Sequence, residues 1–110
     1  ALVEEPFFQD CRNALSPDGV FVTNWWSGDQ RYQRFVERLL NVFEGRVLEL
    51  PAESHGNMAV MAFQSSPKEQ NLDKLKKRAE KLSGQYGLDF KRMLADLKAN
   101  NPNNGKHFYL

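Results

Sequence analysis

The apolar residues of the chain recur at spacings that predict alternating helices and strands. An opening helix carries Phe7, Phe8 and Cys11 on one side, and a second amphipathic helix is predicted for residues 30–43. Between them, "VFVTNWW" (20–26) is a β-branched and aromatic run that is apolar on both faces at its start. Such a run is typical of an interior strand that helices cover on each side.

Two shorter strands are predicted next, "RVLEL" (46–50) and "NMAVMAFQ" (57–64). The strand at 20–26, the helix behind it and "RVLEL" can form a right-handed βαβ unit with parallel strands. The connection between the two short strands is too short for a second parallel crossover, so the last strand is expected to be antiparallel. Three strands leave one sheet edge open, which suggests that the strand at 20–26 lacks a neighbour.

The last part of the chain predicts two helices. Ser66, Pro67 and Glu69 match a capping box with proline at the first helical position, and Asp89 can cap the second helix. The apolar positions of the first of these helices form a narrow stripe, which predicts that this side of the helix packs against a partner surface. The stripe consists of Leu72, Leu75, Ala79, Leu82 and Tyr86, and the second helix carries Phe90, Met93, Leu94 and Leu97.

Charge divides the chain at about the same place. Residues 1–64 contain five Lys and Arg against nine Asp and Glu, whereas residues 65–110 contain ten against five. We therefore expect two parts, an α/β domain over 1–64 and a basic helical tail over 65–110 that packs on it. The net charge is only +1, and the basic run "KLKKR" lacks interleaved aromatic residues, so nucleic acid is not an expected partner.

No catalytic or metal-binding set is found among the reactive residues. Cys11 is the single cysteine, which excludes an internal disulfide, suits a reducing compartment and favours a buried structural thiol. His55 and His107 have no paired ligand at metal-binding spacing and are expected to be exposed. Glu49 and Glu53 are explained as solvated carboxylates at strand ends.

Membrane insertion and secretion are not expected either. No stretch of about 18 apolar residues occurs, and the chain shows no charged segment followed by a short apolar segment of the secretory type. We therefore predict a cytoplasmic location and no membrane partner.

Two long stretches carry a resemblance to a known family. "FFQDCRNALSPDGVFVTNWW", an amphipathic helix and then "GRVLELPAESHGNMAVMAFQ" resemble the carboxyl-terminal half of the spermidine/spermine synthases, the polyamine aminopropyltransferases. The resemblance covers residues 3–64 well. It implies the carboxyl-terminal part of a class I methyltransferase-like, Rossmann-like α/β sandwich, with about three strands, the last of them antiparallel, and a helical tail.

The resemblance also implies a reaction. Members of this family transfer an aminopropyl group from decarboxylated S-adenosylmethionine to an amine such as putrescine. Their glycine-rich nucleotide loop, their acidic ribose ligand and a gate loop whose aspartate prepares the amine nucleophile all precede the part that this chain resembles. The seven glycines here never occur two apart, so the chain has no G-x-G fingerprint. We expect the chain alone to be inactive and to hold no cofactor, with the missing amino-terminal half as its partner.

The candidate substrate-binding residues are Asn24, Trp25 and Trp26, at the carboxyl end of the first strand. Ligands of such sheets bind beyond the carboxyl ends of the strands. Period-two alternation sends the two indoles to opposite faces, so one can pack under a helix while the other borders the ligand crevice. There an indole could contact the aliphatic amine and its ammonium groups. Packing within the core or between subunits is the competing interpretation.

Other functions stay open from the sequence. The parent protein could have a methyltransferase fold and use intact S-adenosylmethionine, or it could be a relative without catalysis. A different class is a small interaction module that forms a homo-oligomer through its open strand edge and the stripe of Leu72 to Tyr86.

Overall fold

The computed structural model describes residues 4–52 and 56–110, which form two compact units. One unit runs to Pro67 and includes Leu110, and the other is Lys68–Tyr109. The order of helices and strands agrees with the sequence prediction, whereas the expected packing of residues 65–110 on the first domain stays a prediction. The elements are α1 (Glu5–Ala14), β1 (Val20–Trp26), α2 (Tyr32–Val42), β2 (Val47–Pro51), β3 (Asn57–Phe63), α3 (Leu72–Tyr86) and α4 (Phe90–Asn100).

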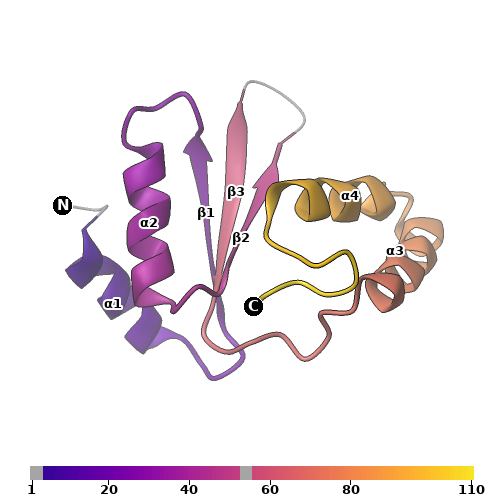
Figure 1. Cartoon of the computed structure of the whole chain (residues 1–110), viewed down its shortest axis with the longest axis horizontal. Coiled ribbons are helices and arrows are strands. Elements are labelled where there is room, and N and C mark those ends of the chain that lie inside the picture. Colours follow the sequence, from indigo (N-terminus) through magenta and orange to yellow (C-terminus); the bar gives the residue numbers. More distant parts are fainter. Residues whose placement is uncertain (1–3, 53–55) are drawn as a thin grey trace. The chain divides into compact units, whose positions relative to one another are not determined.

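The sheet of the first unit has the strand order β1-β3-β2. β3 is antiparallel to both neighbours, so β1 and β2 run in the same direction on either side of it (Figure 1). The α/β fold with an antiparallel last strand is thereby confirmed, and it is consistent with the carboxyl-terminal part of a methyltransferase-like domain. The last strand separates the two parallel strands instead of extending the sheet beyond them.

The core lies on one face of this sheet. The apolar residues of α2 recur at steps of three or four, so they form one stripe that is buried together with Phe8 of α1. The rings of Phe8 and Phe35 meet edge to face with centroids 5.4 Å apart. The buried cluster consists of Phe8, Phe35, Val36, Leu39, Val42, Phe43, Val47, Val60 and Ala62.

Arg12 joins α1 to the ends of two other elements. Its guanidinium donates to the Val42 carbonyl oxygen at 2.6 Å and to Oε1 of Gln64 at 2.9 Å, and Gln64 donates back to the Arg12 carbonyl at 2.9 Å. The carboxylate of Glu44 lies 3.0 Å from Arg46 and 3.7 Å from Arg12. The hydrogen bond from Arg46 and the charges of both arginines lower the Glu44 pKa. The junction fixes the ends of α2 and β3 against α1.

β1 is an edge strand among the described residues, because β3 is its only partner there. Its even-numbered face is open: Val20, Val22 and Trp26 are 41%, 58% and 57% exposed. The sequence suggested an interior strand covered on both faces. Within residues 4–52 and 56–110, one face of β1 is exposed and one of its edges is unpaired, as expected for a strand that lacks a neighbour.

The start of α3 corrects one sequence prediction. Ser66, Pro67 and Glu69 do not cap this helix, which begins at Leu72 with Asn71 as its N-cap. The Asn71 side chain accepts a hydrogen bond from the Lys74 backbone amide at 3.0 Å. Just before the helix, Asn71 forms an antiparallel bridge with His107 in the carboxyl-terminal segment. The Phe108 amide donates to the Gln70 carbonyl, and the Leu72 amide donates to the Lys106 carbonyl.

Gly87 and Asp89 define the turn between α3 and α4. Gly87 ends α3 in the left-handed region, with φ of 71°, where glycine has no steric penalty. The Asp89 side chain then accepts from the Arg92 backbone amide, so Asp89 caps α4 as predicted.

Asp29 lies just before α2 but is not its N-cap. The cap position belongs to Arg31, without a side-chain cap, and Asp29 instead accepts hydrogen bonds from the amide and guanidinium of Arg31. These bonds lower the pKa of Asp29 to about 2.

No helix within residues 4–52 and 56–110 has the length and apolar character needed to cross a membrane.

Candidate functional site

The carboxyl ends of β1 and β2 meet at the same edge of the sheet as the start of β3. Met58 pairs with both Trp25 and Pro51, and Asn57 pairs with Trp26. The sequence placed the segment with the two tryptophans at this edge. An antiparallel strand must start where its parallel neighbours end, so β3 contributes residues there as well.

The three predicted site residues are divided between the two sheet faces. Trp25 lies on the face with the helices and packs against the buried core, whereas Asn24 and Trp26 lie exposed on the other face. The alternation of the two indoles is therefore as predicted. Substrate binding by these residues stays a prediction.

Trp25 is held by a stack of side chains. Its ring lies parallel to that of Phe35, with centroids 4.5 Å apart and an interplanar angle of 10°. The Arg31 guanidinium lies 5.7 Å from the Trp25 centroid, and Asp29 binds that guanidinium at 3.0 Å. Such stacking fixes the indole in the core. Its buried Nε1 has no hydrogen-bond partner among the residues that the structure describes.

Trp26 is exposed, but its ring packs against the turn that follows it. A Cβ atom added to Gly28 would lie 2.5 Å from the indole, so no side chain fits between them. The turn is tied to the start of β3, because the backbone amide and hydroxyl of Ser27 donate to the Gly56 carbonyl at 2.8 and 2.7 Å. The Trp26 indole is therefore a fixed aromatic surface at the sheet edge.

Tyr32 and Glu49 form a contact that the sequence analysis missed. The Tyr32 hydroxyl donates a hydrogen bond to Oε1 of Glu49, and both side chains are half-buried. Burial raises the Tyr32 pKa well above its ordinary value, and the hydrogen bond to Glu49 and the charge there add to this effect. Alternation along β2 gave the available signal, because it places Glu49 on the same face as the buried Val47.

The other candidates do not form a reactive centre. Cys11 is half-buried, and its pKa is raised by burial and by the charge of Asp10, which keeps the thiol protonated. His107 is exposed beside Asn71. Within the described part of the chain, no group of three or more His, Cys, Asp or Glu side chains could hold a metal ion. His55 and Glu53 lie outside the described residues.

The arrangement supports binding more directly than bond chemistry. Trp26 offers an exposed aromatic face, and Asn24, on the same sheet face, offers an amide that can both donate and accept. An aromatic face attracts cations and packs against methylene groups.

The fold and this edge are those of an α/β protein and are consistent with the carboxyl-terminal part of a methyltransferase-like domain. The chain is 86% identical over all 110 residues to proteins from Neisseria meningitidis serogroups A and B that are named polyamine aminopropyltransferase. It is 58% identical, again over its whole length, to the polyamine aminopropyltransferase of Chromobacterium violaceum. The resemblance to this family is thereby confirmed.

The matched region is limited in the relatives. The chain spans 42% of the length of each of these three proteins. No family model matches the chain, and no solved structure matches it significantly.

Proposed function

We propose that this chain is part of a polyamine aminopropyltransferase. The observation that carries the proposal is the identity of 86% and 58%, over the whole chain, with proteins of that name. In the reaction, an amine nitrogen attacks the aminopropyl carbon bound to the sulfonium of decarboxylated S-adenosylmethionine. A carbon–nitrogen bond forms as the carbon–sulfur bond breaks, the sulfur keeps the electron pair, and methylthioadenosine leaves. The attacking nitrogen then loses a proton.

In this proposal, the exposed edge contributes to binding of the acceptor amine. Trp26 is 57% exposed and is held in place by the turn at Gly28. Its indole would pack along the methylene chain and attract the ammonium group at the non-reacting end. Asn24 would accept a hydrogen bond from that group. Trp25 would support the edge from the core and would not touch the substrate.

The remaining parts of the reaction are assigned to other segments of the parent protein. The resemblance locates the nucleotide loop and the gate aspartate before the matched region, so decarboxylated S-adenosylmethionine would be bound there. Those segments would also supply a strand beside β1 and cover Val20 and Val22. We therefore expect the 110-residue chain alone to show no transfer.

Trp26→Ala in the longer gene product tests the proposal. Putrescine and decarboxylated S-adenosylmethionine are supplied, and spermidine is measured by mass spectrometry. We expect transfer by the wild type and a KM for putrescine about tenfold higher in the variant, with kcat little changed, because a binding contact is removed. Tyr86→Ala is the control, since Tyr86 is a similarly exposed aromatic residue in the second unit.

Two results would count against this assignment. Absence of spermidine from the wild type would reject aminopropyl transfer, and methylation of an acceptor from intact S-adenosylmethionine would favour the methyltransferase alternative. If Trp26→Ala and Tyr86→Ala have the same KM for putrescine, the binding role of Trp26 is rejected, but aminopropyl transfer is not.

A second candidate is a stand-alone module that pairs with a copy of itself. The open edge of β1 and the exposed Val20 and Val22 are the observations that favour it, since such an edge can pair with another strand.

A further inference from the structure

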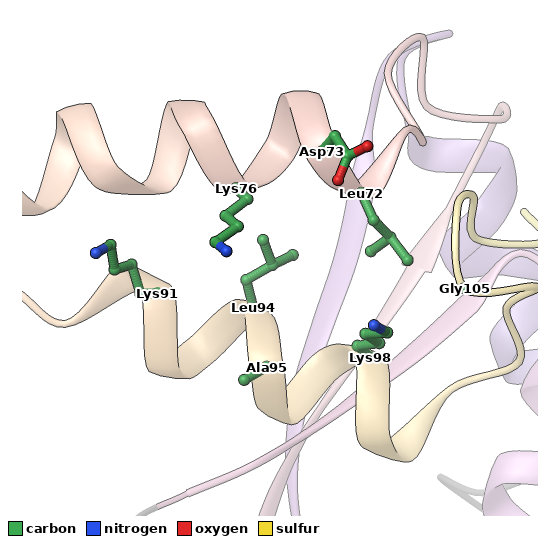
Figure 2. Close-up of a pocket in the computed structure, with 8 residues that line it drawn as sticks. All are labelled: Leu72, Asp73, Lys76, Lys91, Leu94, Ala95, Lys98 and Gly105. Carbon is green, nitrogen blue, oxygen red and sulfur yellow. The ribbon is translucent and has the colours of Figure 1, made fainter.

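A cavity of about 260 Å³ lies between α3 and α4. All its lining residues belong to the second unit, Lys68–Tyr109, so its geometry is set within that unit. Figure 2 shows the Lys76 side chain extending from α3 toward α4, and Leu94 extending from α4 into the gap. The lining residues are Leu72, Asp73, Lys76, Lys91, Leu94, Ala95, Lys98 and Gly105.

The charges around this cavity favour an anion. Three lysines line it, against the single carboxylate of Asp73. Lys91 pairs with Glu80 at 3.8 Å, whereas Lys76 and Lys98 form no ion pair among the residues that the structure describes. Two ammonium groups, one from each helix, are thus available to a ligand between the helices.

The apolar lining adds a second requirement. Leu72 is only 6% exposed, and Leu94 is half-buried beside it in the cavity wall. A fully hydrated ion gains nothing from such a wall, whereas an anion with a short apolar arm can cover it. The size of the cavity limits the ligand to a small molecule.

We propose that the cavity between α3 and α4 binds a small phosphate ester, with its phosphate group between Lys76 and Lys98 and its apolar arm on Leu72 and Leu94. Lysine ammonium groups bind phosphate as point charges. The site is separate from the proposed aminopropyl transfer, because a sulfonium donor and polyamines are cations that these lysines repel. The inference does not rest on the proposed function.

Binding to the 110-residue chain is measured by titration in amide NMR spectra. Phenyl phosphate is the probe, because it joins a phosphate group to an apolar ring that fits the cavity. We expect saturable shifts of the amides of Leu72, Lys76, Leu94 and Gly105. Phenol tests the apolar arm alone, and inorganic phosphate tests the charge alone.

Lys76→Gln with Lys98→Gln is the diagnostic variant. Loss of both charges should weaken phenyl phosphate binding at least about tenfold. The matched control is Lys68→Gln with Lys81→Gln, which removes the same charge from exposed lysines outside the cavity and should change the affinity less than about twofold. All four side chains are exposed, and circular dichroism checks that both variants are folded.

Asp73→Asn gives an opposite expectation. Removing the one carboxylate from the lining should strengthen binding by about two- to fivefold, because its repulsion of the phosphate is lost. If the lysines only stabilised the fold, Asp73→Asn would not strengthen the binding of phenyl phosphate.

The outcomes separate the possibilities. Binding of phenyl phosphate well above inorganic phosphate supports a phosphate ester, and equal binding supports free phosphate at the same two lysines. Binding of phenol equal to phenyl phosphate, shifts spread over all surface lysines, or equal losses in the two lysine variants would overturn the site.

Discussion

Trp25 and Trp26 are adjacent in sequence, yet each is fixed by different neighbours. Trp25 stacks on Phe35 inside the first unit, and Trp26 rests on Gly28 at the surface. The first contact contributes to folding, and the second positions an exposed aromatic face. Stability and substrate affinity should therefore respond to different tryptophans.

Trp25→Ala should lower the free energy of unfolding by about 3 kcal/mol, because it leaves a cavity against the core. Trp26→Ala should change it by less than about 1 kcal/mol, since its side chain is mostly exposed. Urea unfolding of the 110-residue chain, followed by circular dichroism, measures both. Similar losses in the two variants would contradict the division of roles.

Tyr32→Phe tests the contact with Glu49. Loss of a hydrogen bond to a carboxylate should cost about 1.5 kcal/mol at pH 7. Above pH 10.0, the ordinary tyrosine pKa, the phenol ionises in the unfolded chain but stays protonated in the folded one, whose pKa is raised. Rising pH should therefore destabilise the wild type more than the variant. Urea unfolding at pH 7 and above pH 10 measures this, and a constant difference, or a pH response shared with Tyr109→Phe, would refute it.

Sequence alternation was sufficient to place the two tryptophans on opposite faces, but not to find what holds them. The contact of Trp26 with Gly28 depends on the conformation of the turn that follows β1. The hydrogen bond between Tyr32 and Glu49 joins α2 to β2. Glu49 looked like a solvated strand end because its partner lies 17 residues away. Contacts of this kind follow from tertiary packing.

At the scale of elements, the start of α3 shows a local signal overruled by a distant segment. Ser66, Pro67 and Glu69 carry the features of a helix start, yet the helix begins at Asn71. Backbone hydrogen bonds from Leu72 and from Phe108 join the two segments at this point. Pairing between positions more than thirty residues apart has no signature in the local pattern. The start of α4 at Asp89 was predicted correctly.

Asn71→Ala should destabilise the chain by about 1 kcal/mol, because the cap hydrogen bond to the Lys74 amide is lost. Ser66→Ala should have almost no effect, as Ser66 is exposed and does not cap α3. Thermal and urea unfolding compare the two variants. A larger loss from Ser66→Ala would show that the helix begins earlier in solution.

At the scale of the whole molecule, the sequence pattern, the fold and the length of the relatives all indicate that β1 has a further neighbour in a longer protein. The apolar character of residues 20–26 predicted a further neighbouring strand, and in the described part of the chain β1 pairs only with β3 and leaves Val20 and Val22 exposed. The relatives are more than twice as long as this chain. The central claim is that β1 is an interior strand of a larger sheet in a longer aminopropyltransferase.

The intact mass and amino-terminal sequence of the native gene product test this claim most directly. The product is captured from source cells with an antibody against this chain and measured by mass spectrometry. The account predicts a mass well above 12.7 kDa, with additional sequence before Ala1. A native product of 12.7 kDa would contradict it and favour the self-pairing module.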